Sequence, residues 1–284
     1  MFDVCVVGSA NLDLVASTRR LPAPGETVLG TGFAEHAGGK GLNQAIAAAR
    51  AGATTAFIGA VGRDAAGDRL RDELVAASVD VEALARVDAP TGRALIVVDD
   101  DGENLIVVVP GANSTVAVAR LPQARVVLVQ LEIPIAAADA SLRNAKAQGA
   151  MTVLNPAPAS VWTGELEADI VVPNEHEATQ LGGAHAMFGR GASAVVTTLG
   201  SRGAAVVTGE GEWHQPAFSA DVVDTTGAGD AFCGSLAARL AAGDELPSAV
   251  RFAAAAGALA TTRHGAVPAM PGGDQIAALL AASA

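Results

Sequence analysis

The sequence predicts an α/β fold in which helices cover both faces of a central, mostly parallel sheet. Two observations support it: short runs rich in β-branched residues recur along the 284 residues, and Ala-rich helical patterns separate many of them. This alternation is typical of βα units, because parallel strands need crossover connections. The predicted strands span residues 4–8, 55–58, 126–130, 152–154, 170–173, 194–198 and 204–207. The predicted helices span residues 41–51, 66–77, 134–148, 176–181, 230–242 and 246–262.

Two stretches depart from this alternation. Residues 12–33 and 91–110 have the composition of strands and turns, with no helical pattern between them. In the second stretch, residues 94–98 and 104–109 flank Asp101-Gly102, a dipeptide that favours a tight hairpin turn. Because such strands cannot cover both of their own faces, we expect them to pack over a cleft of the main sheet or against another subunit.

Length and cysteine content indicate the general class of protein. A chain of 284 residues can form one large α/β domain or two small ones, and either buries a substantial core. Cys5 and Cys233 each lie in an apolar segment, which favours buried free thiols over a disulfide or a zinc site. We therefore expect a reducing compartment and a cytoplasmic protein.

The net charge and the apolar pattern of the chain argue against nucleic-acid binding, secretion and membrane insertion. A formal net charge of −12 and a pI near 4.7 argue against nucleic acid, whose phosphates require a basic face. The segment Met1–Ala10 lacks the basic region of a signal peptide, and no apolar run approaches the roughly 18 residues of a membrane helix. We expect neither secretion nor membrane insertion. Because the chain is acidic overall, local features must bind any anionic ligand.

The segment Asp224–Asp230 predicts an anion site. Gly227, Ala228 and Gly229 have almost no side chains, so an oxyanion can approach the free N–H groups at the start of the predicted helix. A carboxylate would repel a phosphate, so Asp230 suits a different task, namely accepting a proton from an attacking hydroxyl. The alternative is a helix N-terminus that merely uses Asp and Gly well.

Polar residues also follow the first strand and open the first long helix. Asn11 and Asp13 follow the strand, and the turn 38–43 contains Gly39, Lys40 and Asn43. Together they offer the donors and acceptors that a polyhydroxylated ligand needs, although any one of them alone is more typical of a turn or a solvated surface. The spacing of the Gly-Gly-Lys run does not match a Walker A loop, and no dinucleotide fingerprint follows a strand.

Further candidates follow later strands. Asn174 and Glu177 are three residues apart, which suits either a hydrated Mg²⁺ ion or the cap of a helix. The Gly-punctuated segment 198–203 favours either a nucleotide loop or a simple turn. Glu132 is a lone carboxylate at a strand end and is equally consistent with a surface residue.

Taken in order, these motifs resemble the ribokinase-like carbohydrate kinases, also called the PfkB family, over nearly the whole chain. The matching segments are 8–13, 24–27, 38–45, 130–132, 155–158, 173–177, 198–203 and 224–230. The resemblance implies a single domain over 1–284, with a three-layer α/β/α body and a small β-sheet lid formed by 12–33 and 91–110. It implies ATP-dependent phosphorylation of the primary hydroxyl of a furanose, with D-ribose as the first candidate. Fructose, deoxyribose, ketodeoxygluconate and nucleosides are alternatives, and a sugar-binding regulator without turnover is a remote one.

The resemblance also implies residue roles. Asp230 would be the catalytic base, and Gly227, Ala228 and Gly229 would stabilise charge on the transferring phosphoryl group. Residues at positions that match sugar-binding ones are Asn11, Asp13, Gly39, Lys40, Asn43, Glu132 and Asp230. Asn174 and Glu177 would organise Mg²⁺ with ATP. Residues at positions that match the nucleotide site are Thr198, Gly200, Ser201, Gly203, Gly229 and Ala254.

Two further features follow from the resemblance. The first is a K⁺ site formed by Asp224 and Thr226, with backbone carbonyls of Ala260, Arg263 and Gly265. Ala269 stands where related chains carry Ser, so one hydroxyl of that region is missing here. The second is a homodimer that forms through the lid strands.

Overall fold

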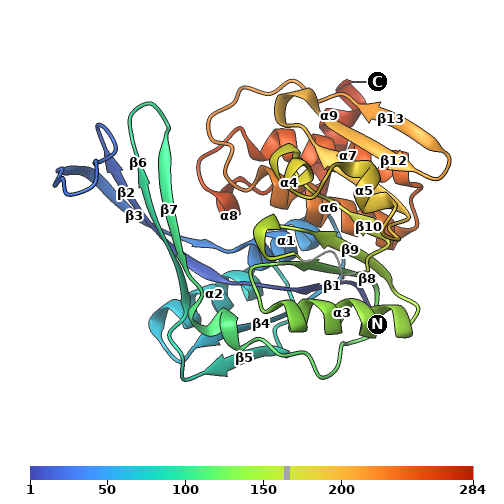
Figure 1. Cartoon of the computed structure of the whole chain (residues 1–284), viewed down its shortest axis with the longest axis horizontal. Coiled ribbons are helices and arrows are strands. Elements are labelled where there is room, and N and C mark those ends of the chain that lie inside the picture. Colours follow the sequence, from blue (N-terminus) through green and yellow to red (C-terminus); the bar gives the residue numbers. More distant parts are fainter. Residues whose placement is uncertain (163–166, 284) are drawn as a thin grey trace.

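The main body of the protein is a nine-stranded sheet. The computed structural model describes residues 1–162 and 167–283, and the sheet has the strand order β13-β12-β11-β10-β9-β8-β1-β4-β5. All neighbouring strands are parallel except in the pairs β11–β12 and β12–β13 (Figure 1). The strands are β1 (Phe2–Val7), β4 (Thr55–Gly62), β5 (Leu84–Val87), β8 (Ala124–Gln130), β9 (Met151–Asn155), β10 (Ile170–Val171), β11 (Ala194–Thr198), β12 (Ala204–Thr208) and β13 (Gly211–Gln215).

Helices cover both faces of this sheet and complete three layers (Figure 1). One face carries α1 (Lys40–Arg50), α2 (Ala65–Ala76), α6 (Ala228–Ala242) and α7 (Leu246–Ala260). The other carries α3 (Ile135–Ala147), α4 (Glu175–Gln180) and α5 (Ala184–Phe188). The short helix α8 (Ala266–Ala269) follows α7, and the C-terminal helix α9 (Gly273–Ala282) packs on α7 through Ile276 and Phe252.

The central strands are buried on both faces, which explains their unbroken apolar character. In β1, Val4 and Val6 pack in the core beneath α1 and α6, whereas Cys5 and Val7 pack in the core beneath α3. All four side chains are fully buried. The predicted α/β fold with helices on both faces is therefore confirmed, and both cysteines are buried free thiols.

A second sheet stands apart from the main body and is called the lid here. Its order is β3-β2-β6-β7, and Figure 1 shows it projecting from one side of the molecule. Its strands are β2 (Asn11–Thr18), β3 (Gly30–Gly38), β6 (Gly92–Val98) and β7 (Asn104–Val109). The predicted range 12–33 ends too early, because β3 continues to Gly38 and leads directly into α1.

Every predicted helix and strand of the main body is present, but some elements were missed. The strands β5 and β13 and the helices α5, α8 and α9 were not predicted. Each is short or lies at an edge of the fold, so its sequence carries little periodicity. In the part of the chain that the structure describes, no helix combines the length and the apolar character needed to cross a membrane.

Candidate active site

Two adjoining cavities lie where the ends of several parallel strands meet the start of α6. Cavity A, of about 590 Å³, is lined by apolar residues that include Phe218, Phe232 and Ala254. Cavity B, of about 630 Å³, is lined by polar residues that include Lys40, Glu177 and Asp230. The residues that line both cavities are Thr198, Gly200, Thr225, Ala228 and Gly229. Ligands of open α/β sheets bind at this end of the strands.

The first turn of α6 faces both cavities. Gly227 has a φ of 78°, and a Cβ atom there would lie 2.8 Å from the Cβ of Ala266, so this position requires glycine. At Gly229, by contrast, a Cβ would meet no heavy atom within 4 Å. The N-terminus of the helix, with its partial positive charge, is therefore bare on the side that lines the cavities, as an anion site requires.

Asp230 is held rigidly in the wall of cavity B, where its side chain is only 8% exposed. Its Oδ2 accepts a hydrogen bond of 2.9 Å from the Nδ2 of Asn43, and its Oδ1 accepts one of 2.9 Å from the Nε2 of Gln44. Close packing of the helices makes this possible, since a Cβ at Gly234 of α6 would lie 2.4 Å from the carbonyl oxygen of Gln44. Sequence reasoning assigned no role to Gln44.

Charged groups gather around Asp230. Burial, together with the smaller effects of the nearby charges of Glu132 and Asp230, raises the pKa of Asp13 to about 7. Burial acts to lower the pKa of Lys40, but the carboxylates of Asp230, Glu132 and Glu177 outweigh burial and raise it. Lys40 therefore stays protonated at neutral pH and balances part of this negative charge.

Glu132 joins the end of β8 to the start of α1. Its Oε2 accepts a hydrogen bond of 2.5 Å from the Ser9 hydroxyl and one of 3.1 Å from the backbone N–H of Lys40. Glu132 is half-buried, and its carboxylate fixes the turn that carries Lys40. Ser9 was not identified as a site residue.

Asn11 and Asp13 lie at the base of the lid. The Nδ2 of Asn113 donates to the Oδ1 of Asn11 at 2.7 Å. The Oδ1 of Asn113 accepts the N–H of Ala10 at 2.9 Å. Asp13 packs over Gly38, where a Cβ would lie 2.1 Å from its Oδ2. Sequence reasoning missed Asn113, which precedes no helix or motif that would mark it.

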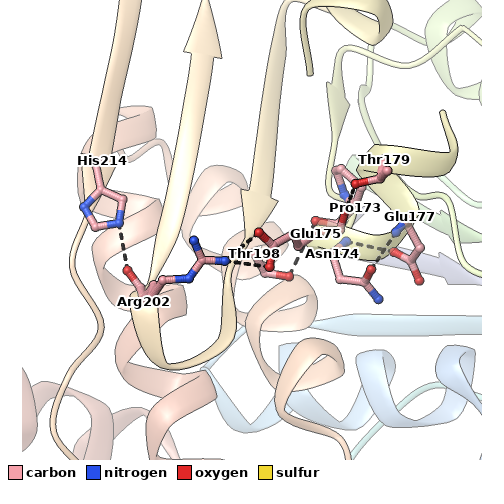
Figure 2. Close-up of polar contacts among 8 residues, drawn as sticks. All are labelled: Pro173, Asn174, Glu175, Glu177, Thr179, Thr198, Arg202 and His214. Atoms are coloured by element: carbon pink, nitrogen blue, oxygen red, sulfur yellow. Dashed lines mark hydrogen bonds and ion pairs between the residues drawn. The ribbon is translucent and has the colours of Figure 1, made fainter. Parts of the chain in front are cut away.

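Asn174 and Glu177 form the cap of α4 (Figure 2). Both residues also line cavity B. The Oδ1 of Asn174 accepts the N–H of Glu177, and the Oε2 of Glu177 accepts the N–H of Asn174, both at 2.8 Å. Burial raises the pKa of Glu177, and the hydrogen bond from Asn174 and the charge of Lys40 oppose this shift. The structure contains the predicted helix cap. The carboxylate of Glu177 still lies beside cavity B.

The segment 198–203 turns beside cavity A, which Thr198, Gly200, Ser201 and Gly203 line. Gly203 has a φ of 93°, and a Cβ there would lie 2.0 Å from the carbonyl oxygen of Gln215. Figure 2 shows the guanidinium of Arg202 paired with the carboxylate of Glu175 at 2.6 Å, which ties this turn to α4. Ala254 lines the same cavity from α7.

Asp224 connects two loops of the candidate cation site. Its Oδ1 accepts the N–H of Thr226 and its Oδ2 accepts the N–H of Gly265, both at 2.8 Å. Burial acts to raise the pKa of Asp224, but these hydrogen bonds outweigh it and lower the pKa. Ala260 is buried at the end of α7, Arg263 is exposed in the connecting loop, and Ala269 is buried in α8.

Comparison with known proteins shows the family to which this chain belongs. The model of the pfkB family carbohydrate kinases matches residues 1–272. The chain belongs to this family of carbohydrate kinases. It is similar to a ribokinase of Staphylococcus aureus, with 38% identity covering 94% of this chain and 96% of the relative. It is also similar to a ribokinase of Bacillus subtilis, with 36% identity covering 99% of this chain and 100% of the relative.

Solved structures agree with this membership. A structure of Arabidopsis thaliana ribokinase complexed with ribose and ATP superposes with a TM-score of 0.88 and 32% identity, covering 98% of both chains. This member of the carbohydrate kinase family is therefore a phosphotransferase that acts on a sugar hydroxyl, with the ribokinase-like three-layer fold. The roles of its individual residues stay predictions. The structure brings these residues together in and around the two cavities.

Proposed function

We propose that this kinase transfers the γ-phosphoryl group of ATP to the primary hydroxyl of D-ribose. The observation that carries the proposal is the placement of Asp230, a carboxylate fixed beside the bare N-terminus of α6 where two cavities adjoin. Full-length similarity to ribokinases, one of them complexed with ribose and ATP, supports ribose as the acceptor and ATP as the donor.

In this proposal Asp230 accepts the proton of the attacking hydroxyl. The hydroxyl oxygen forms a bond to the γ-phosphorus, the bond from that phosphorus to the bridging oxygen breaks, and ADP leaves with the bonding electron pair. The N–H groups at Gly227–Gly229 and the positive end of α6 stabilise the charge that spreads over the phosphoryl oxygens. The protonated side chain of Lys40 adds positive charge in the same cavity.

The sugar binds in this proposal between the base of the lid and α1. Asn11, Asp13 and Glu132 lie at that base, and Asn43 joins it to the catalytic carboxylate. In this proposal Asn43 also contacts a sugar hydroxyl; its Oδ1, which is buried here, has no hydrogen-bond partner among the described residues. When the lid covers the sugar it excludes water, which suppresses hydrolysis of ATP.

The adenine ring of ATP fits cavity A in this proposal, between apolar residues such as Phe218 and Ala254. The triphosphate then runs past the turn 198–203 toward Gly229. Alanine at position 254 leaves room where a larger side chain would contact the base.

Mg²⁺ fits the oxygen donors at the edge of cavity B. Glu177 offers a carboxylate there, and no group of three or more His, Cys, Asp or Glu side chains that could hold a metal occurs among the described residues. Mg²⁺ needs only a small number of protein ligands, because it keeps several waters and binds phosphate oxygens. When bound it would neutralise charge on the phosphates, and Asn174 would hold the Glu177 carboxylate in place.

K⁺ fits the loops that Asp224 joins. The carboxylate of Asp224 brings residues 224–226 beside Gly265, and the carbonyl of Thr261 accepts the N–H groups of Val223 and Asp224. Backbone carbonyls of Ala260, Arg263 and Gly265 would complete the site in this proposal. Such a cation would stabilise the loop that leads into the anion site.

A second copy of this chain is the proposed partner of the lid. The edge strand β7 is exposed along its whole length, and Leu105, Ile106 and Val107 are half exposed or more. An apolar edge strand of this kind is a ready template for another chain. The two buried free thiols are consistent with action in the cytoplasm, which we also propose.

A coupled assay of ADP release tests the main proposal. The purified chain receives ATP, Mg²⁺ and, in separate reactions, ribose, deoxyribose, fructose, ketodeoxygluconate and a nucleoside, each with Na⁺ and then with K⁺. We expect the highest kcat/KM with ribose, and phosphorus NMR should show the phosphate on O5. Preference for another acceptor would overturn the ribose assignment, and sugar-independent ADP release alone would overturn sugar kinase activity.

The variant Asp230→Asn tests the role of the base in the same assay. Loss of a general base and of its charge should lower kcat by several orders of magnitude. Asp274→Asn, in the first turn of α9, serves as the matched control and should leave kcat unchanged. Activity of Asp230→Asn near that of the native chain would overturn the proposed role.

A further inference from the structure

We infer that Gln44 is a positioning residue that fixes the orientation of the Asp230 carboxylate. The inference rests on the proposed function, because it concerns the base of that reaction. It starts from one observation: the side chain of Gln44 is completely buried, and its Nε2 lies 2.9 Å from the Oδ1 of Asp230.

A chain of amides determines which way Gln44 faces. The Nδ2 of Asn155 donates to the carbonyl oxygen of Val172 at 2.8 Å, so the Oδ1 of Asn155 points toward Gln44. That oxygen accepts the second N–H of Gln44 at 3.1 Å. Because both neighbours of the Gln44 Nε2 atom are acceptors, the amide has one consistent orientation, and both of its protons are used.

The other end of the Gln44 amide shows what the position requires. Its Oε1 is buried and has no hydrogen-bond partner within residues 1–162 and 167–283. A buried carbonyl without a partner costs stability, whereas a methionine of similar size would not carry that cost. The need for a glutamine here therefore lies in its two N–H groups, one of which serves the base.

Gln44 and Asn43 serve the carboxylate in different ways. In the proposed function Asn43 belongs to the sugar-binding residues and also contacts Asp230. The other contact of Gln44 is to the protein, at Asn155. Removing the amide of Gln44 should therefore lower kcat and leave the KM for the sugar unchanged, whereas changes at Asn43 should affect both constants.

The amide also favours the ionised base. A hydrogen bond donated to a carboxylate stabilises its charged form, as the nearby charge of Lys40 does, whereas the carboxylates of Asp13 and Glu177 act against it. Without the Gln44 N–H, the acid limb of the pH profile of kcat should lie at a higher pH. The acid limb of the pH profile is the readout that a purely structural role would not move.

The test compares Gln44→Met, Gln44→Glu and the matched control Gln130→Met. Gln130 is also completely buried, but neither atom of its amide has a partner within the described residues, so its loss removes no donor from Asp230. The variables are kcat and KM for ribose between about pH 5 and pH 9, a span set by the limbs of such profiles. Cooperative thermal unfolding of each variant shows that it folds.

We expect Gln44→Met to lower kcat about 10- to 100-fold at neutral pH, with the acid limb about 1 pH unit higher, as loss of one charge-assisted hydrogen bond implies. Gln44→Glu should move the limb further, because two adjacent carboxylates share a proton. Gln130→Met should keep the native profile. An acid limb of Gln44→Met that coincides with the native limb would overturn the inference.

A second measurement separates this inference from the proposed function. The carbon NMR signal of the Asp230 carboxyl group, assigned by its loss in Asp230→Asn, is titrated in the native chain and in Gln44→Met without any substrate. A higher midpoint in Gln44→Met supports the inference even if ribose is not the acceptor. Equal midpoints overturn it even if ribose is phosphorylated.

Discussion

The carboxylate of Asp224 accepts the N–H of Gly265 at 2.8 Å, which joins two loops that lie 41 residues apart in the chain. The same carboxylate accepts the N–H of Thr226, just before the first turn of α6. The loop after α7 is thus connected directly to the segment that presents the candidate anion site. This connection gives the proposed cation a route by which it can affect phosphoryl transfer.

The variant Asp224→Ala tests this connection. Loss of both hydrogen bonds should let the two loops separate, so K⁺ should no longer raise kcat/KM for ATP relative to Na⁺. Asp221→Ala, an exposed neighbour, is the matched control. Rates of both variants are measured as K⁺ replaces Na⁺ at constant ionic strength. Equal activation by K⁺ in Asp224→Ala and in the native chain would contradict the proposed site.

Two glycines of the anion site should respond differently to alanine. Gly229→Ala should stabilise α6 by about 0.5–1 kcal/mol, because alanine favours helices, but its methyl group would occupy the space left for phosphate. We therefore expect higher thermal stability together with a large loss of kcat/KM for ATP. Unfolding scans and initial rates measure the two effects, and native kinetics in this variant would argue against phosphate binding there.

Gly227→Ala is the companion variant and should act mainly on stability. The φ of 78° and the 2.8 Å approach to the Cβ of Ala266 make a side chain at this position strained. We expect a loss of at least about 1 kcal/mol in the free energy of unfolding. Urea denaturation measures it, and unchanged stability would show that the turn adapts.

The raised pKa of Asp13 predicts how stability depends on pH. A folded-state pKa of about 7 against an ordinary value of 3.8 means that the folded chain binds the extra proton between these values. Its stabilising contribution is complete below the lower value and is lost as the pH rises to about 7 and beyond. The free energy of unfolding should therefore fall with rising pH in this window, by at most about 1.4 kcal/mol per pH unit from this group.

The variant Asp13→Asn should remove that slope, because an amide does not titrate. Denaturation in urea at several pH values between about 4 and 7 measures the effect on the sugar-free protein. Asp72→Asn, on the exposed face of α2, should keep the native slope. A native slope in Asp13→Asn would show that other groups cause the dependence.

The lid should mediate dimerisation. The double variant Ile106→Lys with Val107→Lys places charge on both faces of the edge strand β7, since neighbouring residues of a strand point to opposite sides. We expect a native dimer and a monomeric double variant in sedimentation equilibrium. The control variant is Met151→Lys, because Met151 is an exposed apolar residue on the main body. This variant should remain a dimer. A native monomer would contradict the proposal.

The motifs that lie close together in the sequence were predicted well. Gly227, Ala228, Gly229 and Asp230 are consecutive, so a sequence pattern suffices to place bare amides beside a carboxylate at the start of a helix. The capping pair of Asn174 and Glu177 is equally local, and the structure contains the predicted cap. The two-faced burial of the central strands followed from their unbroken apolar runs.

Contacts between distant residues could not be predicted in this way. Gln44 meets Asp230 across 186 positions, and Asn113 meets Asn11 across 102. No periodicity of the sequence marks either contact. The first depends on how closely α1 packs on α6, and the second depends on where the lid joins the body. The partners of Glu132, Ser9 and Lys40, could not be predicted for the same reason, since they lie at least 92 positions away.

The amino-acid sequence alone determined the fold class, the approximate position of the lid strands and the residue types available for phosphoryl transfer, because local patterns encode strands, helices and helix ends. Only the tertiary structure decided which amide holds each oxygen of Asp230 and which carboxylates raise the pKa of Asp13. The physical reason is that burial, charge and hydrogen-bond geometry act through space, and only the packed chain brings these side chains within a few ångströms of one another.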